Sequence, residues 1–87
     1  MVDVDLDVTA KQILLATFAS PKTPAELSRI LGISGAIIVD YLELLERFGL
    51  AHVVLSYFGR DGRIVRYYEG VLPIDTSDLE VEEVAEP

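Results

Sequence analysis

The chain has 87 residues, of which 51% are hydrophobic and 25% are charged, and its formal net charge is −8. A chain of this length and composition is expected to form one small folded domain rather than a disordered segment. It contains no cysteine, which excludes disulfides and thiolate metal sites, and it has no apolar run near the ~18 residues of a membrane span, so we expect a cytoplasmic protein without a membrane partner.

The negative charge is concentrated at the two ends of the chain. Residues 1–7 carry three acidic side chains and residues 75–87 carry six, and neither segment has a basic one. Residues 8–74 contain six acidic and seven basic side chains. The centre is therefore nearly neutral, and the net charge of the whole chain does not by itself exclude a nucleic-acid partner.

Hydrophobic and acidic residues alternate from Met1 to Val8, where Val2, Val4 and Leu6 are separated by aspartates. A period of two predicts a half-buried β-strand, which would need a sheet edge in this chain or in a second copy. The alternative is a frayed arm in which the alternation has no structural meaning. We therefore treat residues 1–8 as an N-terminal strand or arm.

The first helix is predicted over residues 9–20. Thr9 and Gln12 fit a capping box at its start, and Pro21 ends it. Helical spacing places four of its residues on one buried face, namely Ile13, Leu14, Thr17 and Phe18.

The second helix is predicted to begin after Thr23 and to end at Leu31. Thr23 and Glu26 fit a second capping box, and Pro24 suits the first helical position because its missing N–H would have no partner there. The residues expected to face the interior are Leu27, Ile30 and Leu31.

A tight turn connects this helix to a third helix, predicted over residues 34–48. Gly32 suits the left-handed position that ends a helix, and Ser34 suits the cap of the next one. Gly49 closes the third helix in the same way, and Leu50 is placed to pack back onto it. The stripe expected to face the interior comprises Ile38, Leu42 and Leu45, widened by Tyr41, Leu44 and Phe48.

After Gly49 the period changes, and two strands are predicted at residues 51–58 and 64–68. Asp61-Gly62 between them is a strong signal for a two-residue type I′ turn. That turn would pair Arg60 with Arg63, Tyr57 with Arg66 and Leu55 with Tyr68. One face would then carry Val53, Leu55, Tyr57, Ile64 and Tyr68, and the other Val54, Phe58, Val65 and Tyr67. Because both faces are apolar, we expect a homodimer that covers the surplus surface.

Residues 73–87 are predicted to form an acidic C-terminal tail. Pro73 ends the hairpin, and the segment after it is rich in acidic residues. A short helix capped by Ser77 with Glu80 is one interpretation, and a solvated flexible tail is the favoured one. The folded domain is therefore expected over residues 9–72.

The order helix, helix, turn, helix, hairpin resembles a winged helix-turn-helix domain over residues 9–70. The residues that carry the resemblance are Thr23 to Ser28, Leu31 to Ser34, Tyr41 to Glu46, Phe48 to Leu50 and Gly59 to Arg63. The chain looks most like the small bacterial and archaeal regulators of the MarR and ArsR type. The resemblance implies an α+β fold of three helices followed by a two-stranded β-hairpin wing, to which the N-terminal strand would be an addition. It also implies a transcriptional regulator that binds double-stranded DNA.

In that family the third helix enters the major groove of DNA and commonly begins with Ser, Thr, Arg or His. In this chain only Ser34 and Tyr41 carry hydroxyls near the start of the helix, and no basic or amide side chain is present there. Base reading by hydrogen bonds needs such donors, whereas Ala36, Ile37 or Val39 suits apolar contact with thymine methyl groups. We therefore predict that Ser34, Ala36, Ile37 and Tyr41 contact DNA, and that the missing donors and the acidic residues of the same helix act against base-specific reading.

The wing carries Arg60, Arg63 and Arg66 within seven residues. Three arginines on a projecting hairpin suit contacts with phosphates or with a narrow minor groove. The alternative is that they keep the hairpin soluble and pair with acidic side chains. Lys22 and Arg29 are predicted to add phosphate contacts near the second helix, or else to be ordinary solvated charges.

A rival interpretation is a protein-interaction module, because winged helices also serve as docking domains. In this interpretation the third helix docks a protein partner through Ala36 and Val39 and reads no DNA. His52 is the only histidine and opens a strand, so we predict no metal site and no cofactor. No arrangement of nucleophile and base is recognisable, and we expect no enzymatic activity.

Overall fold

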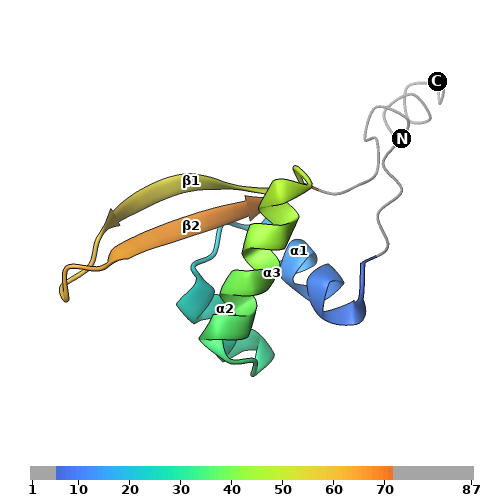
Figure 1. The fold of residues 1–87 in the computed structure, drawn as a ribbon, viewed down its shortest axis with the longest axis horizontal. Helices are drawn as coiled ribbons and strands as arrows, with labels where there is room; N and C mark the ends of the chain where they lie inside the picture. The colour runs from blue at the N-terminus through green and yellow to red at the C-terminus, as the bar shows by residue number, and fades with distance from the viewer. Residues whose placement is uncertain (1–5, 72–87) are drawn as a thin grey trace, which may run out of the picture.

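The computed structural model describes residues 6–71, which form three helices followed by a two-stranded antiparallel hairpin. The elements are α1 (Val8–Ala19), α2 (Pro24–Leu31), α3 (Gly35–Arg47), β1 (Ala51–Phe58) and β2 (Ile64–Gly70). The helices pack together, and the hairpin projects from them to one side (Figure 1). The predicted order of elements is confirmed. In this part of the chain no helix is long and apolar enough to cross a membrane.

The predicted N-terminal strand and acidic tail fall largely outside the described residues. Residues 1–5 and residues 72–87 are not described, so most of the first prediction and the whole predicted tail, 73–87, stay predictions. At residues 6–8 the structure differs from the predicted strand, because Val8 is already the first residue of α1. The alternation thus ends where helical hydrogen bonding begins.

The start of α1 is set by Asp7 rather than by the predicted Thr9 and Gln12. The Asp7 side chain accepts a hydrogen bond from the backbone N–H of Ala10 at 2.8 Å, which satisfies one of the unpaired donors of the first turn. Phe18 was expected to be buried and is 49% exposed. The buried residues of α1 are Ala10, Ile13, Leu14 and Thr17. The buried stripe of α1 thus includes Ala10 in place of the predicted Phe18, and Phe18 lies at the margin of this stripe.

The start of α2 and the turn after it confirm the sequence signals. Glu26 N–H donates to Thr23 Oγ1 at 3.1 Å, and Thr23 N–H donates to Glu26 Oε1 at 2.9 Å, which completes the capping box. Gly32 ends α2 with a φ of 70°, the left-handed conformation that a residue without Cβ adopts at little cost. Ile30, predicted to face inward, is 56% exposed, because the short α2 buries only Leu27 completely.

Three residues of α3 form its buried stripe. Ile38, Leu42 and Leu45 are fully buried, as predicted, whereas Leu44 and Phe48 are exposed. The stripe is therefore narrower than predicted, because the small domain covers only one side of the helix. After the positive φ of Gly49, Leu50 donates its N–H to the Leu45 carbonyl at 2.8 Å and is buried. The start of α3 at Ser34 and its end at Gly49 thus agree with the prediction. 

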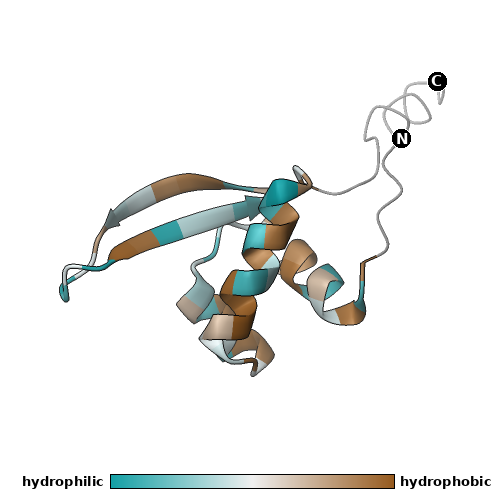
Figure 2. Ribbon diagram, in the orientation of Figure 1, coloured by the Kyte–Doolittle hydropathy of each residue, from teal (hydrophilic) through white to brown (hydrophobic). Residues whose placement is uncertain are grey.

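One core joins all the elements. It is formed by Ile13, Leu14, Leu27, Ile38, Leu42, Leu45, Leu50, Ala51 and Tyr68. Figure 2 shows hydrophobic residues on the inner sides of the helices and also along the hairpin. Gly70 brings the end of β2 close to α1, because a Cβ there would lie 2.5 Å from Thr17 Oγ1 and 2.7 Å from the Leu14 carbonyl oxygen. The base of the hairpin is therefore fixed to the helices, and its outer part projects beyond them.

The hairpin register differs by one residue from the predicted one. Phe58 pairs with Ile64, Tyr57 with Val65, Ser56 with Arg66 and Leu55 with Tyr67. The loop has three residues, Arg60 to Gly62, and it is closed by a hydrogen bond from Gly59 N–H to the Arg63 carbonyl at 2.7 Å. A type I′ turn would require positive φ at Asp61 as well as at Gly62, and only Gly62 has it, at 82°. Asp61 instead accepts the Arg63 N–H at 3.0 Å, which favours the longer loop.

The new register rearranges the faces of the hairpin. Leu55 and Tyr57 now share a face with Val65 and Tyr67, and the Tyr57 and Tyr67 rings stack with centroids 6.3 Å apart. An irregularity between Val53 and Leu55 shifts the pairing towards the base, where Val53 lies opposite Tyr68. The predicted grouping of Leu55 and Tyr57 with Ile64 and Tyr68 is therefore wrong. The bulge keeps Val53 against the core although the outer part of the hairpin has the other register.

Candidate nucleic-acid interface

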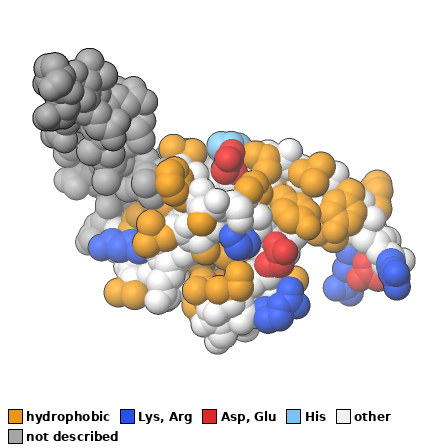
Figure 3. Space-filling model, turned by 180° about the vertical axis from the view of Figure 1, so that it is seen from behind, with side chains coloured by type: hydrophobic (Ala, Val, Ile, Leu, Met, Phe, Trp, Pro, Cys, Tyr) orange, Lys and Arg blue, Asp and Glu red, His pale blue; other side chains and the backbone are white. Residues whose placement is uncertain are grey.

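The wing tip presents two exposed arginines, Arg60 and Arg63, which we call the wing-tip arginines. Figure 3 shows basic side chains gathered around an acidic one at the end of the hairpin. Arg63 Nε lies 3.8 Å from Asp61 Oδ2, and these side chains are 87% and 66% exposed. An ion pair this open to water contributes little to stability. Arg63 can therefore leave Asp61 and bind another anion at a small cost in free energy.

The first turn of α3 presents hydroxyl and apolar groups. Ser34 Oγ accepts the Ile37 N–H at 3.3 Å, which confirms its capping role. Ala36 and Ile37 are exposed beside it. This end of α3 therefore offers methyl and methylene groups to a partner, and the Ser34 hydroxyl is already engaged as an acceptor.

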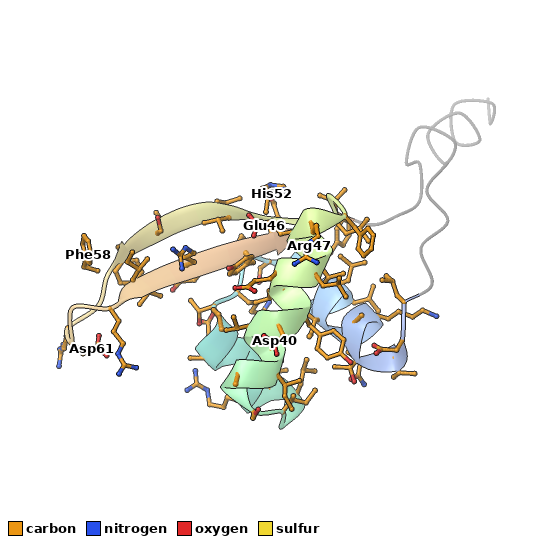
Figure 4. All side chains as sticks on the ribbon, viewed as in Figure 1. Asp40, Glu46, Arg47, His52, Phe58 and Asp61 are labelled. Carbon is orange, nitrogen blue, oxygen red and sulfur yellow. The ribbon has the colours of Figure 1, made fainter. Side chains whose placement is uncertain are left out.

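The exposed side of α3 further along is mainly acidic. Asp40, Glu43 and Glu46 are exposed, and Arg47 in the last turn is the one base on α3. Figure 4 shows Asp40 midway along the helix and Glu46 and Arg47 towards its end, while Asp61 lies at the far end of the hairpin. Carboxylates on this side would repel phosphates. These carboxylates therefore oppose contact of DNA with α3 beyond its first turn.

An open cavity of about 340 Å³ lies between the hairpin and the helices. It is lined by Thr23, Pro24 and Ala25 of α2, Val39 and Glu43 of α3, and Asp61, Arg63, Ile64, Val65, Arg66 and Tyr68 of the hairpin region. Two basic side chains, Arg63 and Arg66, thus share one concave surface with the start of α2 and the middle of α3. Glu43 places a negative charge on the helix side of the same surface.

Tyr41 and Lys22 have partners within the domain. The Tyr41 hydroxyl donates to Asp7 Oδ2 at 2.7 Å, which ties α3 to the start of α1. This hydrogen bond raises the pKa of Tyr41. The pKa of Asp7 is lowered by the backbone N–H of Ala10 and, secondarily, by Tyr41. Lys22 Nζ donates to the Ala16 carbonyl at 2.9 Å, at the end of α1.

Lys22 is held by further contacts in addition to the one with α1. Its ammonium group donates to Ser20 Oγ at 2.7 Å and to the Ser20 carbonyl at 3.2 Å. Its backbone pairs with Tyr68 on the edge of β2 away from β1. Three hydrogen bonds within the domain would have to compete with a phosphate for the same ammonium group. Lys22 thus has a structural role that its sequence position did not reveal.

The remaining predicted residues lie on separate surfaces. Arg29 is exposed in the last turn of α2. Arg66 is exposed on β2, opposite Ser56, and borders the cavity. The structure thus gathers Arg63 and Arg66 at one concave surface, with Arg60 beside them in the loop.

Asp7, which links α1 to α3, was missed by the sequence analysis, although an acidic residue just before a helix is a typical cap.

The described residues have the fold of solved winged-helix structures. The structure of ZitR from Lactococcus lactis, a zinc-responsive MarR family member, matches with a TM-score of 0.61 and 26% identity, covering 97% of this chain and 55% of that chain. A singly substituted variant of ZitR matches with a TM-score of 0.63 and 23% identity, covering 98% and 54%. A doubly substituted variant matches with a TM-score of 0.62 and 24% identity, covering 95% and 53%. The chain therefore spans about half the length of these structures.

Three helices, a tight turn between the second and third, and a hairpin after the third define a winged helix-turn-helix domain, and the solved structures confirm this fold. No protein-family model matches the chain. No curated protein matches it in sequence. Within residues 6–71, no group of three or more His, Cys, Asp or Glu side chains is placed to hold a metal ion.

Proposed function

We propose that this chain is a DNA-binding transcriptional regulator that places the first turn of α3 in the major groove and its wing arginines on phosphates. The observation that carries the proposal is the cavity that the wing and the helices line together. Arg63 and Arg66 border it from the hairpin, and Val39 borders it from α3. A duplex lying against α3 would therefore pass within reach of the arginines. The likeness to a MarR family member supports the same arrangement.

In this complex the arginines would supply affinity for DNA, and α3 would supply sequence preference. Arg60, Arg63 and Arg66 are exposed, and contacts between arginine and phosphate supply affinity without sequence information. Ala36 and Ile37 would supply sequence preference through thymine methyl groups, which is weaker than bidentate hydrogen bonding. We expect moderate affinity with a strong salt dependence and a modest preference among sequences.

The protein-docking alternative is favoured by the chemistry of α3. Its exposed residues are apolar at the first turn and acidic beyond it, which suits a partner with apolar and basic groups. A docking surface of this kind would leave DNA binding weak or absent. Removing a carboxylate from α3 separates the two functions, because only DNA binding is opposed by that charge.

A homodimer is part of the proposal. The hairpin exposes apolar side chains on both faces, including Phe58 at 72% and Leu55 at 56%, which is more than a monomeric domain needs to expose. A dimer would place two copies of α3 on one duplex, as two-fold operators require.

The proposal is tested by the salt dependence of binding to a labelled duplex of mixed sequence. Three phosphate contacts predict that log K falls with log salt concentration with a slope of roughly −2.7 for each copy bound. Glu43→Gln should tighten binding by about twofold to fivefold, because it removes a like charge from the shared cavity. Glu46→Gln, on the same helix and outside the cavity, serves as the matched control.

Two results would contradict DNA binding. One is the absence of any binding to duplex at about 50 mM salt, where phosphate contacts are strongest. The other is a binding constant that does not change with salt or with Glu43→Gln. Either outcome would favour the docking function of α3.

A further inference from the structure

β1 is an edge strand whose outer side has no strand partner among residues 6–71. The sheet has the order β1–β2, and the other edge of β2 is bridged by Lys22 through Tyr68. β2 is therefore flanked on both sides, whereas β1 is flanked on one. A strand of eight residues with a free edge is a ready template for pairing with another strand.

The pattern of hydrogen bonds shows which residues direct their backbone to this free edge. Gly59 donates to Arg63 across the hairpin, so this is a hydrogen-bonded pair. Because such pairs alternate along an antiparallel ladder, Tyr57 and Leu55 direct their backbone groups to β2. Ser56 and Phe58 between them direct their N–H and C=O groups outward. The free edge is thus centred on Ser56.

The side chains along this edge are unusually apolar for an exposed strand. Phe58 is 72% exposed, Leu55 56%, Tyr57 48% and Val54 44%, and Ser56 lies between them. Figure 3 shows hydrophobic side chains spread along the hairpin between the histidine near its base and the charged tip. Edge strands that must stay single usually carry lysine, proline or inward-pointing charge, and β1 carries none of these on its outer half.

We propose that the free edge of β1 pairs antiparallel with β1 of a second copy, so that Ser56 lies opposite Ser56 of the second copy. Residues that direct their backbone outward can pair across this edge. A two-fold axis at Ser56 then places Phe58 of each copy opposite Val54 of the other, where β1 has its irregularity. On the opposite face it brings Tyr57 of each copy against Leu55 of the other. Every strongly exposed apolar side chain of β1 is then matched with another one.

The charges also fit this pairing. Antiparallel strands place the two wing tips at opposite ends of the joint sheet, so the arginines of the two copies do not meet. Each tip instead lies beside the start of the other β1, where His52 pairs with Glu69 of β2, whose half-buried carboxylate lies 3.2 Å from His52 Nε2. Arg60 at the tip of one copy therefore approaches an opposite charge on the other.

The size of the interface sets the expected affinity. A fully exposed aromatic side chain presents about 150–250 Å², so the four exposed side chains of β1 present at most roughly 400 Å² in each copy. The neighbouring strand covers only part of this area, so even with the two strand backbones the total stays below the ~1,200 Å² at the lower limit of stable interfaces. We therefore expect a dimer that dissociates at micromolar concentrations. This inference rests on the homodimer of the proposed function and names its surface. Its test involves no DNA, so its failure would leave the proposed contacts of α3 and the wing arginines with DNA untouched.

The register is tested by opposite charges at the axis. Ser56→Lys alone and Ser56→Glu alone should each raise the dimer dissociation constant about fivefold or more, because like charges then lie directly opposite each other. An equimolar mixture of the two variants should restore a dimer at least as tight as that of the wild type. Mass is measured by sedimentation equilibrium of the full 87-residue chain. The matched control is Gln12→Lys with Gln12→Glu, on the exposed side of α1.

A second variant tests the contact directly. The chain has no cysteine, so Ser56→Cys introduces a single thiol. Opposite residues in a hydrogen-bonded antiparallel pair have Cα atoms about 5.5 Å apart, within the range that a disulfide spans. Mild oxidation should therefore cross-link most of Ser56→Cys as a dimer and little of Gln12→Cys.

Three outcomes would overturn the proposal. The first is a monomer at every concentration up to about 100 µM, far above the expected dissociation range, which would leave the edge to another partner. The second is a dimer whose dissociation constant in both charge variants of Ser56 equals that of the wild type, which would place the interface elsewhere. The third is a Gln12→Cys cross-link as efficient as that of Ser56→Cys.

Discussion

Removing the wing-tip arginines is the most direct perturbation of the proposed complex. Replacing Arg60 and Arg63 together by alanine leaves the loop intact, because its hydrogen bonds join Gly59 N–H to Arg63 O and Asp61 Oδ1 to Arg63 N–H. None of these bonds uses a guanidinium group. The ion pair between Arg63 and Asp61 is too exposed to contribute measurably. The double variant should therefore fold like the wild type and differ in its charge.

The expected magnitude follows from the number of phosphate contacts. Each lost contact lowers the steepness of the salt dependence by about 0.9, so the double variant should lose about 1.8 from the slope. Between 50 and 200 mM salt the wild type should then lose about 12-fold more affinity than the variant. The loss at low salt should be similar for every duplex sequence, because arginine–phosphate contacts carry no sequence information.

Fluorescence anisotropy of a labelled duplex at three salt concentrations measures both quantities. The matched control replaces Lys11 and Arg47, an exposed pair with the same charge on α1 and on the last turn of α3. An equal change of slope in the control would show that net charge, and not the wing, governs binding. An unchanged slope in the double variant would refute the contact of the wing with phosphate.

Three further predictions concern the core, the first helix and the acidic tail. Leu42→Ala, at a fully buried position, should lower the free energy of unfolding in urea by about 2–5 kcal/mol, and a loss below about 1 kcal/mol would contradict its central place. The pKa of Asp7 is lowered below its ordinary 3.8, so its stabilisation is present above that pH and is lost as the pH falls through the lowered value. Asp7→Ala should thus lower the melting temperature at about pH 7 but hardly at about pH 2, and an equal loss at both would refute the role of the carboxylate. Deleting residues 75–87, which carry six acidic side chains, should tighten DNA binding most at low salt by unshielding the wing-tip arginines; equal gains in the wild type and in the double arginine variant would exclude that shielding.

The ends of α2 and α3 could be predicted from the sequence because capping is local. Thr23 and Glu26 reach each other within one turn, and Ser34 and Gly32 act on backbone groups a few residues away. Their hydrogen bonds need no other part of the chain. The same is true of the apolar spacing of Ile38, Leu42 and Leu45. The order of elements, and with it the resemblance to winged helix-turn-helix domains, rests on these local signals.

The roles of several candidate residues were decided by contacts between distant parts of the chain. Tyr41 was predicted to face DNA, but its hydroxyl donates a hydrogen bond to Asp7, 34 residues earlier in the chain. Lys22 was predicted to contact phosphate, and its ammonium group lies against the end of α1. The periodicity of the sequence cannot predict these two hydrogen bonds, because they depend on how α1 packs against α3 and β2.

The hairpin register was also decided by tertiary structure. Asp61-Gly62 fits both a two-residue and a three-residue loop, and the difference of one residue exchanges the faces of the strands. The sheet bridge between Lys22 and Tyr68 and the close approach of Gly70 to α1 fix the base of β2 against the helices. The sequence by itself determined the order of the elements and the position of Arg60 and Arg63 at the tip of the wing. Packing at the base of the hairpin, together with the negative φ of Asp61, decided which apolar side chains line its free edge.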